Sequence, residues 1–355
     1  MAEGSTVQLC EIGRHAQGGI TPKKFCEKLG GSLSVFESLN LIQIQKCRNL
    51  KFRYLILDES DVQREYAEKL EGIEKVRDGS TGNLYGQGYG IISVIGITKD
   101  EEYIPLILQR YTTIQIGRKA VIRKAIEALG PDTGAVWLID RGADDEKLFS
   151  FLLKEKQQFL IRLDRRGGER CLTVDGPEGM EKHKVSALTA HMVKSGYRKV
   201  KLPKRPEALT LLHYHGYLKQ EPMALLTTLS PRTPKQAEAI AKAYRKRWKI
   251  ENYLRFIKGR FRLEDVMIKL PDRVDGLPAL VLIASAFVMK QMQRIKEASD
   301  IALTAFYAWW AGRERCDLSW SSVARFLRHV FRSREVTLRT VFKSDESLQL
   351  ALLFV

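Results

Sequence analysis

The stretch between residues 242 and 262 combines a single carboxylate with an unusual density of cations. It contains nine Lys or Arg residues but only one acid, Glu251. If the stretch is wound as a helix, Tyr244, Arg247, Glu251 and Lys258 fall within about a 60° arc. The adjoining arc is apolar and can dock the helix on a sheet; it carries Ile250, Leu254, Ile257 and Phe261. A solvated helix face usually interleaves acids with its cations, so this pattern favours a surface that faces phosphate groups.

Two aspartates upstream each follow a short apolar run. Asp58 comes directly after Tyr54–Leu57, and Asp140 comes directly after Ala135–Ile139. Taken singly, each is more simply explained as a strand-end turn residue or a helix cap. Their joint occurrence with Glu251 predicts one site with three carboxylates. The alternatives for the two aspartate positions are Asp61 for the first and Asp144 or Asp145 for the second.

Other polar residues give weaker signals. His213 and His215 alternate on one predicted strand face, but no third metal ligand lies near them, which favours packing or DNA contact. The glycines of residues 86–90 do not form a phosphate-binding GxGxxG motif before a helix. The cysteines are odd in number and form no CxxC pair, which argues against a disulfide framework and a zinc site; they are Cys10, Cys26, Cys47, Cys171 and Cys316.

The periodicity of the chain predicts the elements that must position these residues. Three β-rich runs indicate an antiparallel meander, and two further apolar strands alternate with two amphipathic helices. The predicted strands cover residues 54–58, 91–97, 103–111, 135–140 and 159–163, and the predicted helices cover 117–129 and 143–157. The order β-β-β-α-β-α-β is that of a ribonuclease-H-like fold. We therefore predict an α/β protein whose mixed sheet is flanked by helices and interrupted by a β-rich insertion.

Five regions are expected along the chain. The first resembles a helix-turn-helix loosely, so it is either a DNA-binding element or a packing arm. Arginines in the last region form either a second DNA surface or solvated helix faces. The regions are a small helical region (1–50), the first part of the core (51–164), the β-rich insertion (165–230), core helices that carry Glu251 (231–297) and a helical C-terminal region (298–355).

The composition limits the classes of protein to which the chain can belong. Its 355 residues carry 59 Lys or Arg against 42 Asp or Glu, a formal net charge of +17 that points to a polyanionic partner. With 44% hydrophobic residues the chain can bury a core, which excludes disorder as its main state. The longest apolar run, Leu277–Met289, contains Pro278 and is shorter than the roughly 20 residues of a membrane span. The N-terminal segment lacks the pattern of a signal peptide, so we expect a cytoplasmic protein without contact with a membrane.

Three sequence blocks together resemble a known family, the DDE transposases of the insertion sequence 4 family. Leu57-Asp58 is similar to that family's first aspartate motif, and Trp137–Gly142, in which Asp-Arg-Gly follows a buried strand, is similar to its second. The third block resembles the family's signature helix, because a Y-x2-R-x3-E-x6-K spacing is formed by Tyr244, Arg247, Glu251 and Lys258. The blocks occur in the right order and cover about residues 52 to 290. The resemblance implies an interrupted ribonuclease-H-like core.

The resemblance also implies a chemistry. Phosphodiester cleavage and joining need an activated nucleophile and a stabilised 3′ oxygen, and two Mg²⁺ ions about 3.5 to 4 Å apart supply both. Mn²⁺ is expected to substitute for Mg²⁺. Asp58 would bridge both metals, while Asp140 and Glu251 would each hold one. DNA contacts are implied for Tyr244, Arg247, Trp248, Lys258 and Arg141, although Trp248 could instead be a buried aromatic residue.

On this resemblance we expect a Mg²⁺-dependent DNA transposase that cuts at transposon ends and joins the freed 3′ ends to target DNA. It would bind double-stranded DNA as a homodimer, in the cytoplasm of a bacterium. Two alternatives stay open. A ribonuclease-H-like nuclease would hydrolyse DNA without joining ends, and a non-catalytic DNA-binding protein derived from a transposase would not need all three acids.

Overall fold

The computed structural model describes residues 33–64, 73–76, 86–112, 118–130, 134–164, 170–177, 179–190, 192, 196–215, 222–264, 271–297 and 319–332. Several predictions lie outside these residues. They concern residues 1–32 of the N-terminal region and residues 298–318 and 333–355 of the C-terminal region, with the arginines that these last two segments contain.

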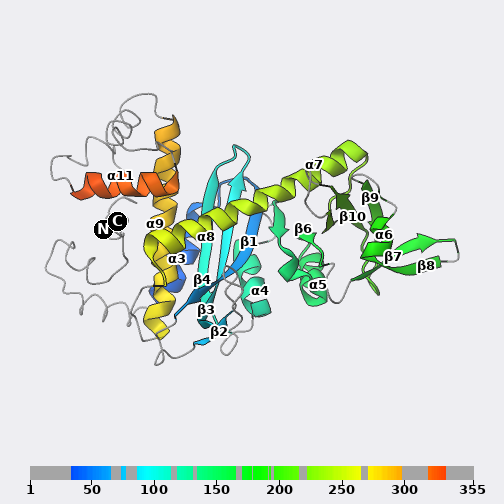
Figure 1. The fold of residues 1–355 in the computed structure, drawn as a ribbon, viewed down its shortest axis with the longest axis horizontal. Coiled ribbons are helices and arrows are strands. Elements are labelled where there is room, and N and C mark those ends of the chain that lie inside the picture. The colour runs from blue at the N-terminus through cyan, green and yellow to red at the C-terminus, as the bar shows by residue number, and fades with distance from the viewer. Residues whose placement is uncertain are drawn as a thin grey trace.

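A nine-stranded mixed sheet forms the centre of the protein (Figure 1). Its first part is an antiparallel meander of β1, β3 and β4, with the short β2 beside β3. Two strands, β5 and β6, then continue parallel to β1. The bounds are β1 (Phe52–Gln63), β2 (Glu74–Val76), β3 (Gly86–Thr98), β4 (Tyr103–Tyr111), β5 (Val136–Ile139) and β6 (Gln158–Arg162). A three-stranded meander followed by two parallel strands is the predicted ribonuclease-H-like arrangement.

Three of the five strands between residues 171 and 227 lengthen the main sheet rather than standing apart from it. β11 pairs with β6, β10 with β11 and β9 with β10, all antiparallel. β7 and β8 form a separate two-stranded ribbon, and the short helix α6 follows it. The bounds are β7 (Cys171–Gly176), β8 (Gly179–Lys184), α6 (Val185–Ala190), β9 (Gly196–Val200), β10 (Leu209–Tyr214) and β11 (Met223–Thr227).

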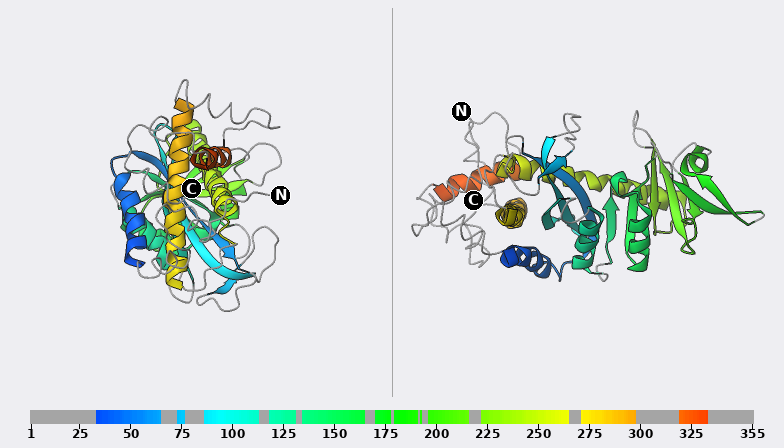
Figure 2. Two further views of the ribbon diagram at one scale, coloured as in Figure 1. Left: turned by 90° about the vertical axis from the view of Figure 1, so that its left-hand side faces the viewer. Right: turned by 90° about the horizontal axis from the view of Figure 1, so that it is seen from below.

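Helices cover both faces of the sheet, as the views of Figure 2 show. On one face α4 (Arg118–Leu129) and α5 (Glu146–Lys154) share a core with residues such as Leu57 and Trp137. On the other face α7 (Pro234–Tyr244) and α8 (Trp248–Phe261) pack over Ile56 and Leu138. The remaining helices are α9 (Pro271–Glu297), which contacts β4, and α3 (Leu33–Lys46) and α11 (Trp320–Arg332), which contact α9.

One helix has the length and hydropathy of a membrane span. This segment of α9, Val274–Ile295, has a mean hydropathy of 1.4 in its most apolar window. Because 78% of that window is buried within the protein, the segment has the character of a core helix.

The sequence prediction fails at two points that matter for the site. The first strand does not end at Asp58, because β1 continues to Gln63 and pairs with the glycine-rich start of β3. Glycine permits this pairing, since a Cβ atom on Gly88 would lie 2.1 Å from the Val62 carbonyl oxygen. The stretch of residues 242–262, treated above as one helix, is also divided, because a 3₁₀ turn, η3 (Arg245–Arg247), separates α7 from α8. Both differences affect residues that line the candidate site.

Candidate active site

The register of two strands brings both candidate aspartates to one face of the sheet. β1 and β5 pair in parallel, with Ile56 opposite Leu138. Both of these residues lie in the core beneath α7 and α8. Because alternate side chains of a strand share a face, Asp58 and Asp140, two positions further along, project toward the same helices. The sheet therefore presents two carboxylates to the basic segment of the chain.

Three carboxylates from three elements meet one guanidinium group. Arg247 Nη1 lies 3.1 Å from Asp58 Oδ2, Nη2 lies 2.7 Å from Glu251 Oε1, and Nε lies 3.8 Å from Asp140 Oδ1. We call Asp58, Asp140 and Glu251 the acidic triad. The Arg247 side chain is 7% exposed, whereas the triad side chains are between 19% and 47% exposed. The residues predicted as catalytic thus lie together, with Arg247 between them.

Burial changes the protonation of Asp58. It raises the pKa of this carboxyl group from 3.8 to about 6, against the opposing effects of the Arg247 charge and a hydrogen bond from the Glu59 backbone N–H. That N–H donates to Asp58 Oδ1 at 3.0 Å. For Arg247, burial acts to lower the pKa, but neighbouring groups, with Tyr244 the largest contributor and Asp140 next, raise it overall. Arg247 is therefore a permanent cation within the triad.

Tyr244 and Arg247 do not face solvent. Their residues are 3% and 6% exposed. The Tyr244 hydroxyl lies 3.1 Å from Asp140 Oδ1 and 3.3 Å from the Ile139 carbonyl oxygen. Burial, with the Asp140 charge as the next cause, raises the pKa of Tyr244 above its usual range. Both residues therefore contact the acids, while phosphate contact by either residue stays a prediction.

Two of the triad residues border an open cleft of about 440 Å³. Asp58 and Asp140 line it together with three residues that the sequence analysis missed, Glu59, Tyr111 and Arg118. Arg118 donates from Nε to Glu59 and from Nη2 to the Gly142 carbonyl oxygen at 3.0 Å, while the Tyr111 hydroxyl lies 3.1 Å from Glu59 Oε2. The sequence offered little indication that Arg118 belongs to the cleft, because this residue lies in an ordinary amphipathic helix. Arg118 thus joins β1 to the turn that follows Asp140.

Gly142 of the Asp-Arg-Gly motif has a steric role in this junction. A Cβ atom at this position would lie 2.8 Å from Arg118 Nη2. The absence of a side chain therefore lets the guanidinium approach the backbone of the turn.

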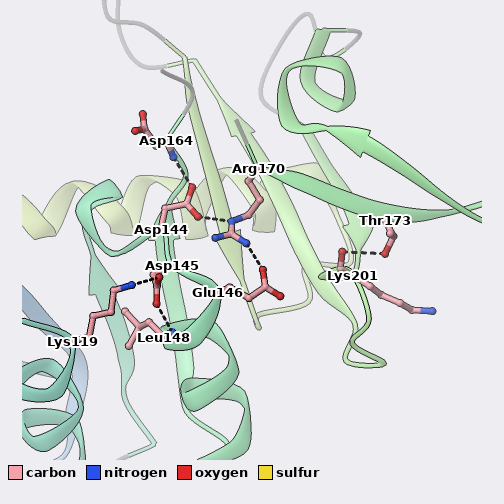
Figure 3. A network of polar contacts seen from close by, with 9 residues as sticks. All are labelled: Lys119, Asp144, Asp145, Glu146, Leu148, Asp164, Arg170, Thr173 and Lys201. Atoms are coloured by element: carbon pink, nitrogen blue, oxygen red, sulfur yellow. Dashed lines mark hydrogen bonds and ion pairs between the residues drawn. The ribbon is translucent and has the colours of Figure 1, made fainter. Parts of the chain in front are cut away.

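The alternatives for the second aspartate have structural roles (Figure 3). Asp145 caps α5 by accepting from the Leu148 N–H at 3.1 Å, and it pairs with Lys119 at 2.6 Å. Asp144 accepts from Arg170 Nε and from the Asp164 N–H. Asp140 itself makes no side-chain capping bond to the 3₁₀ turn η2 (Arg141–Ala143), so it is not a helix cap.

Asp61, the alternative for the first aspartate, lines the same cleft as Asp58. Its Oδ1 lies 4.0 Å from Lys258 Nζ, which is also 3.7 Å from Glu264 Oε1. Lys258 is therefore held beside the cleft by acids, and it does not belong to the group of residues around Arg247.

Two predicted DNA-binding residues lie on the surface. Trp248 is 41% exposed, and the Arg245 guanidinium lies 5.9 Å from the centroid of its ring. The alternative of a buried Trp248 is therefore wrong. Arg141 is exposed at the start of η2, directly after Asp140. Both side chains are accessible to a macromolecular ligand.

The donor set of the triad suits a hard divalent cation, because all its ligating atoms are carboxylate oxygens. Among the described residues, however, no three His, Cys, Asp or Glu side chains lie close enough to enclose one metal ion. The triad carboxylates are instead arranged around the cationic group of Arg247. The residues therefore fit divalent metals in chemical type, provided that Arg247 moves.

The two histidines show no metal site either. The rings of His213 and His215 meet edge to face with centroids 4.6 Å apart, and His213 Nδ1 lies 3.1 Å from the Met192 carbonyl oxygen. These contacts are consistent with packing, one of the two roles that the sequence favoured.

Comparisons with known proteins identify the domain that carries this site. The family model described as "Transposase DDE domain" matches residues 56–287, which is more than half of the chain. A comparison with curated proteins finds no match. Among solved structures, the chain is similar to the piggyBac transposase in a synaptic complex with hairpin DNA, at 10% sequence identity and a TM-score of 0.46. That similarity covers 83% of this chain and 57% of the other, so the chain spans little more than half the length of that relative. The family match shows that this chain belongs to the DDE transposases.

Proposed function

We propose that the chain is a DNA transposase of the insertion sequence 4 type, which cuts at transposon ends and joins the freed 3′ ends to target DNA. One observation carries the proposal: within a DDE transposase domain, carboxylates from β1, from the end of β5 and from α8 all lie within 3.8 Å of the Arg247 guanidinium, and the first two line one cleft. Convergence of acids from distant parts of the chain is expected of a metal-dependent phosphodiester site.

The acidic triad would hold two Mg²⁺ ions, or two Mn²⁺ ions in their place. Asp58 would contact both ions, and Asp140 and Glu251 would each contact one. When bound, the ions would activate the attacking oxygen and stabilise the departing 3′ oxygen. The Tyr244 hydroxyl, at 3.1 Å from Asp140 Oδ1, would orient that carboxylate. Tyr244 is thus a positioning residue in this proposal.

The substrate would be double-stranded DNA, with a homodimer assembled on it in a bacterial cytoplasm. The surface of α7, η3 and α8 supports this substrate, since exposed cations include Lys242, Arg245, Lys249 and Arg255. Lys258 and Arg141 would position the backbone phosphates near the triad, and Trp248 would stack on a base. Phosphate contacts of this kind position DNA without reading its sequence.

The function is tested with a plasmid that carries the DNA flanking the reading frame on both sides of a marker. Purified protein and Mg²⁺ should release the marker segment and join its 3′ ends to a second plasmid, and Asp140→Asn should do neither. Hydrolysis without joined products would identify a nuclease. Binding without cleavage would identify a non-catalytic DNA-binding protein.

The DNA contact of Lys258 has its own test. Lys258→Ala should reduce the slope of log affinity against log salt by about one unit, because one fewer phosphate is neutralised. Lys199→Ala is the matched control, since Lys199 is exposed on the edge strand β9, outside the surface formed by α7, η3 and α8. Equal slopes for wild type and Lys258→Ala would contradict the contact.

A further inference from the structure

We propose that Arg247 is a resident counter-ion of the acidic triad, which must leave the triad before divalent metal ions can bind there. The departing guanidinium would bind a DNA phosphate, so that metal binding and DNA binding favour each other. This inference rests on the proposed function, because it requires the triad to be the metal site.

The contacts of Arg247 support the first half of the inference. Its guanidinium lies within 3.8 Å of all three triad carboxylates, and the side chain is 7% exposed. A planar guanidinium offers several N–H donors in a fixed fork, so one residue can hold several carboxylates at once. Its Nε atom is nevertheless buried without a hydrogen-bond partner in the described part of the protein. The group therefore offsets part of the triad's charge, and one of its own donors is left unsatisfied.

The charges do not balance in this arrangement. One guanidinium charge faces three carboxylates, and two of these carboxylates line an open cleft. Like charges held close together destabilise one another, especially where solvent is partly excluded. The triad therefore keeps an attraction for further positive charge after Arg247 is bound.

A metal ion and Arg247 cannot use the same oxygen atoms without conflict. Mg²⁺ binds carboxylate oxygens at about 2.0 to 2.1 Å. Arg247 Nη1 already lies 3.1 Å from Asp58 Oδ2, and Nη2 lies 2.7 Å from Glu251 Oε1. An ion bound to these oxygens would crowd and repel the guanidinium. Binding of two divalent cations therefore requires the Arg247 side chain to withdraw.

The local backbone offers a place for such a movement. Arg247 is the last residue of η3, the 3₁₀ turn between α7 and α8. A 3₁₀ segment within a longer helical path often marks a hinge. Arg245, Trp248 and Lys249 beside it are exposed, so a short rotation would carry the guanidinium toward a basic surface. A DNA phosphate on that surface can accept two parallel N–H bonds from an arginine.

Coupling between metal binding and DNA binding follows from the competition between Arg247 and metal ions for the triad. If Arg247 and metal ions compete for the triad, then any ligand that removes Arg247 from the triad must tighten metal binding. By thermodynamic reciprocity, metal ions must then tighten the binding of that ligand. The triad would therefore load with metal mainly when DNA is present.

The test measures Mn²⁺ binding to the full chain, without DNA, by calorimetry or by the electron paramagnetic resonance of free Mn²⁺. Arg247→Gln should bind Mn²⁺ about tenfold more tightly than the wild type. Arg198→Gln is the matched control, because it removes the same charge from an exposed position on β9, the edge strand of the sheet. It should change Mn²⁺ affinity by less than about twofold, as a distant surface charge is screened by solvent.

A second arm adds a short blunt DNA duplex of arbitrary sequence. The duplex should tighten Mn²⁺ binding to the wild type by about tenfold, and to Arg247→Gln by less than about threefold. Arg247→Lys is a second variant, which tests the same inference if Arg247→Gln fails to fold. Lysine keeps the charge but loses the fork that reaches three carboxylates, so it should tighten Mn²⁺ binding in the same direction by a smaller factor.

The outcomes separate this inference from the proposed function. If Asp140→Asn abolishes Mn²⁺ binding but Arg247→Gln binds Mn²⁺ no more tightly than the wild type, the triad is the metal site and Arg247 is not its competitor. If Asp140→Asn and Glu251→Gln leave Mn²⁺ binding unchanged, the triad is not the metal site, and both proposals are overturned. Tighter binding by Arg247→Gln that also needs Asp140 supports the competition.

Discussion

Arg247 and Arg170 each bind more than one carboxylate, and their surroundings differ in a way that separates the proposed active site from a structural network. Arg247 is surrounded by the acidic triad beside an open cleft. Arg170 binds Asp144 and Glu146 between β6, β7 and α5 (Figure 3). Asp140 and Asp144, four residues apart in the sequence, therefore belong to different kinds of network.

The difference lies in the other partners of each acid. Asp144 is 8% exposed, and its second oxygen accepts from the Asp164 N–H at 2.9 Å, so both of its oxygens are used by the fold. Asp140 is 34% exposed and makes no capping bond to the turn that follows it. Carboxylate oxygens keep capacity for a ligand only when the protein has not already satisfied them. This criterion distinguishes the two acids better than their sequence context does.

The largest expected effect is on DNA cleavage, which should depend on the acids around Arg247 but not on those around Arg170. Asp58→Asn, Asp140→Asn and Glu251→Gln should each lower metal-dependent DNA cleavage by at least about a thousandfold, because each removes a proposed ligand of the metal ions. DNA affinity should be unchanged or higher, since a negative charge near phosphate is removed. Asp144→Asn should cleave at the wild-type rate per folded molecule. Cleavage and filter binding measure both quantities, and wild-type cleavage by any triad variant would contradict its assignment.

The next effect concerns proton binding by metal-free protein. Burial raises the pKa of Asp58 from 3.8 to about 6, so the folded chain holds a proton that the unfolded chain releases between these values. The free energy of unfolding should therefore fall as pH rises from about 4 to about 6, by up to about 3 kcal/mol. Asp58→Asn removes this contribution, so its stability relative to the wild type should increase with pH. Urea unfolding in chelator measures the difference, and a difference independent of pH would show that Asp58 is ionised throughout this range.

The same comparison shows what the sequence could predict. The apolar runs before Asp58 and Asp140 predicted strands, and the two-residue alternation of strands places both acids on one face, as found. The continuation of β1 to Gln63 was missed, because residues 59–61 border a cleft and lack the apolar alternation that marks a strand. The order of the elements predicted the fold, since these strands and helices are strongly periodic.

The positions of Tyr244 and Arg247 were predicted less well. A single helix wound at 100° per residue placed them on a phosphate-facing arc, but η3 changes the phase between α7 and α8. More importantly, carboxylates on β1 and β5 attract these side chains into the protein. A helical projection contains no information about a charged partner on another element, so their burial required the tertiary structure.

A smaller effect is expected from the structural network. Asp144→Asn should lower the free energy of unfolding by roughly 2 kcal/mol, because the charge of Arg170 loses its most buried partner. The loss is moderate, since Arg170 keeps Glu146 at 3.0 Å and the Asn oxygen still accepts from the Asp164 N–H. Urea denaturation measures this change. A variant as stable as the wild type would show that the Arg170 network is dispensable, which would weaken the contrast drawn between the two arginines.

The smallest effect concerns Arg118, which joins the two strands that carry the triad aspartates. Gly142→Ala would place a Cβ atom 2.8 Å from Arg118 Nη2, at the far end of a flexible side chain that can move aside. We therefore expect a change in stability of less than about 1 kcal/mol. The displaced guanidinium should lose its bond to the Gly142 carbonyl oxygen, and cleavage should fall several-fold because the turn after Asp140 is less firmly positioned.

A double-mutant cycle decides whether this loss acts through Arg118. Arg118→Ala removes the side chain that the new Cβ atom would displace, so Gly142→Ala should have little further effect on cleavage in that background. Two residues in contact are expected to show such non-additivity, whereas independent sites would show additive losses. Additive losses would mean that Gly142 is required for another reason, such as close approach of DNA to the turn. Non-additive losses would extend the site to Arg118, which joins β1 to the turn after Asp140 without binding any of the triad carboxylates directly.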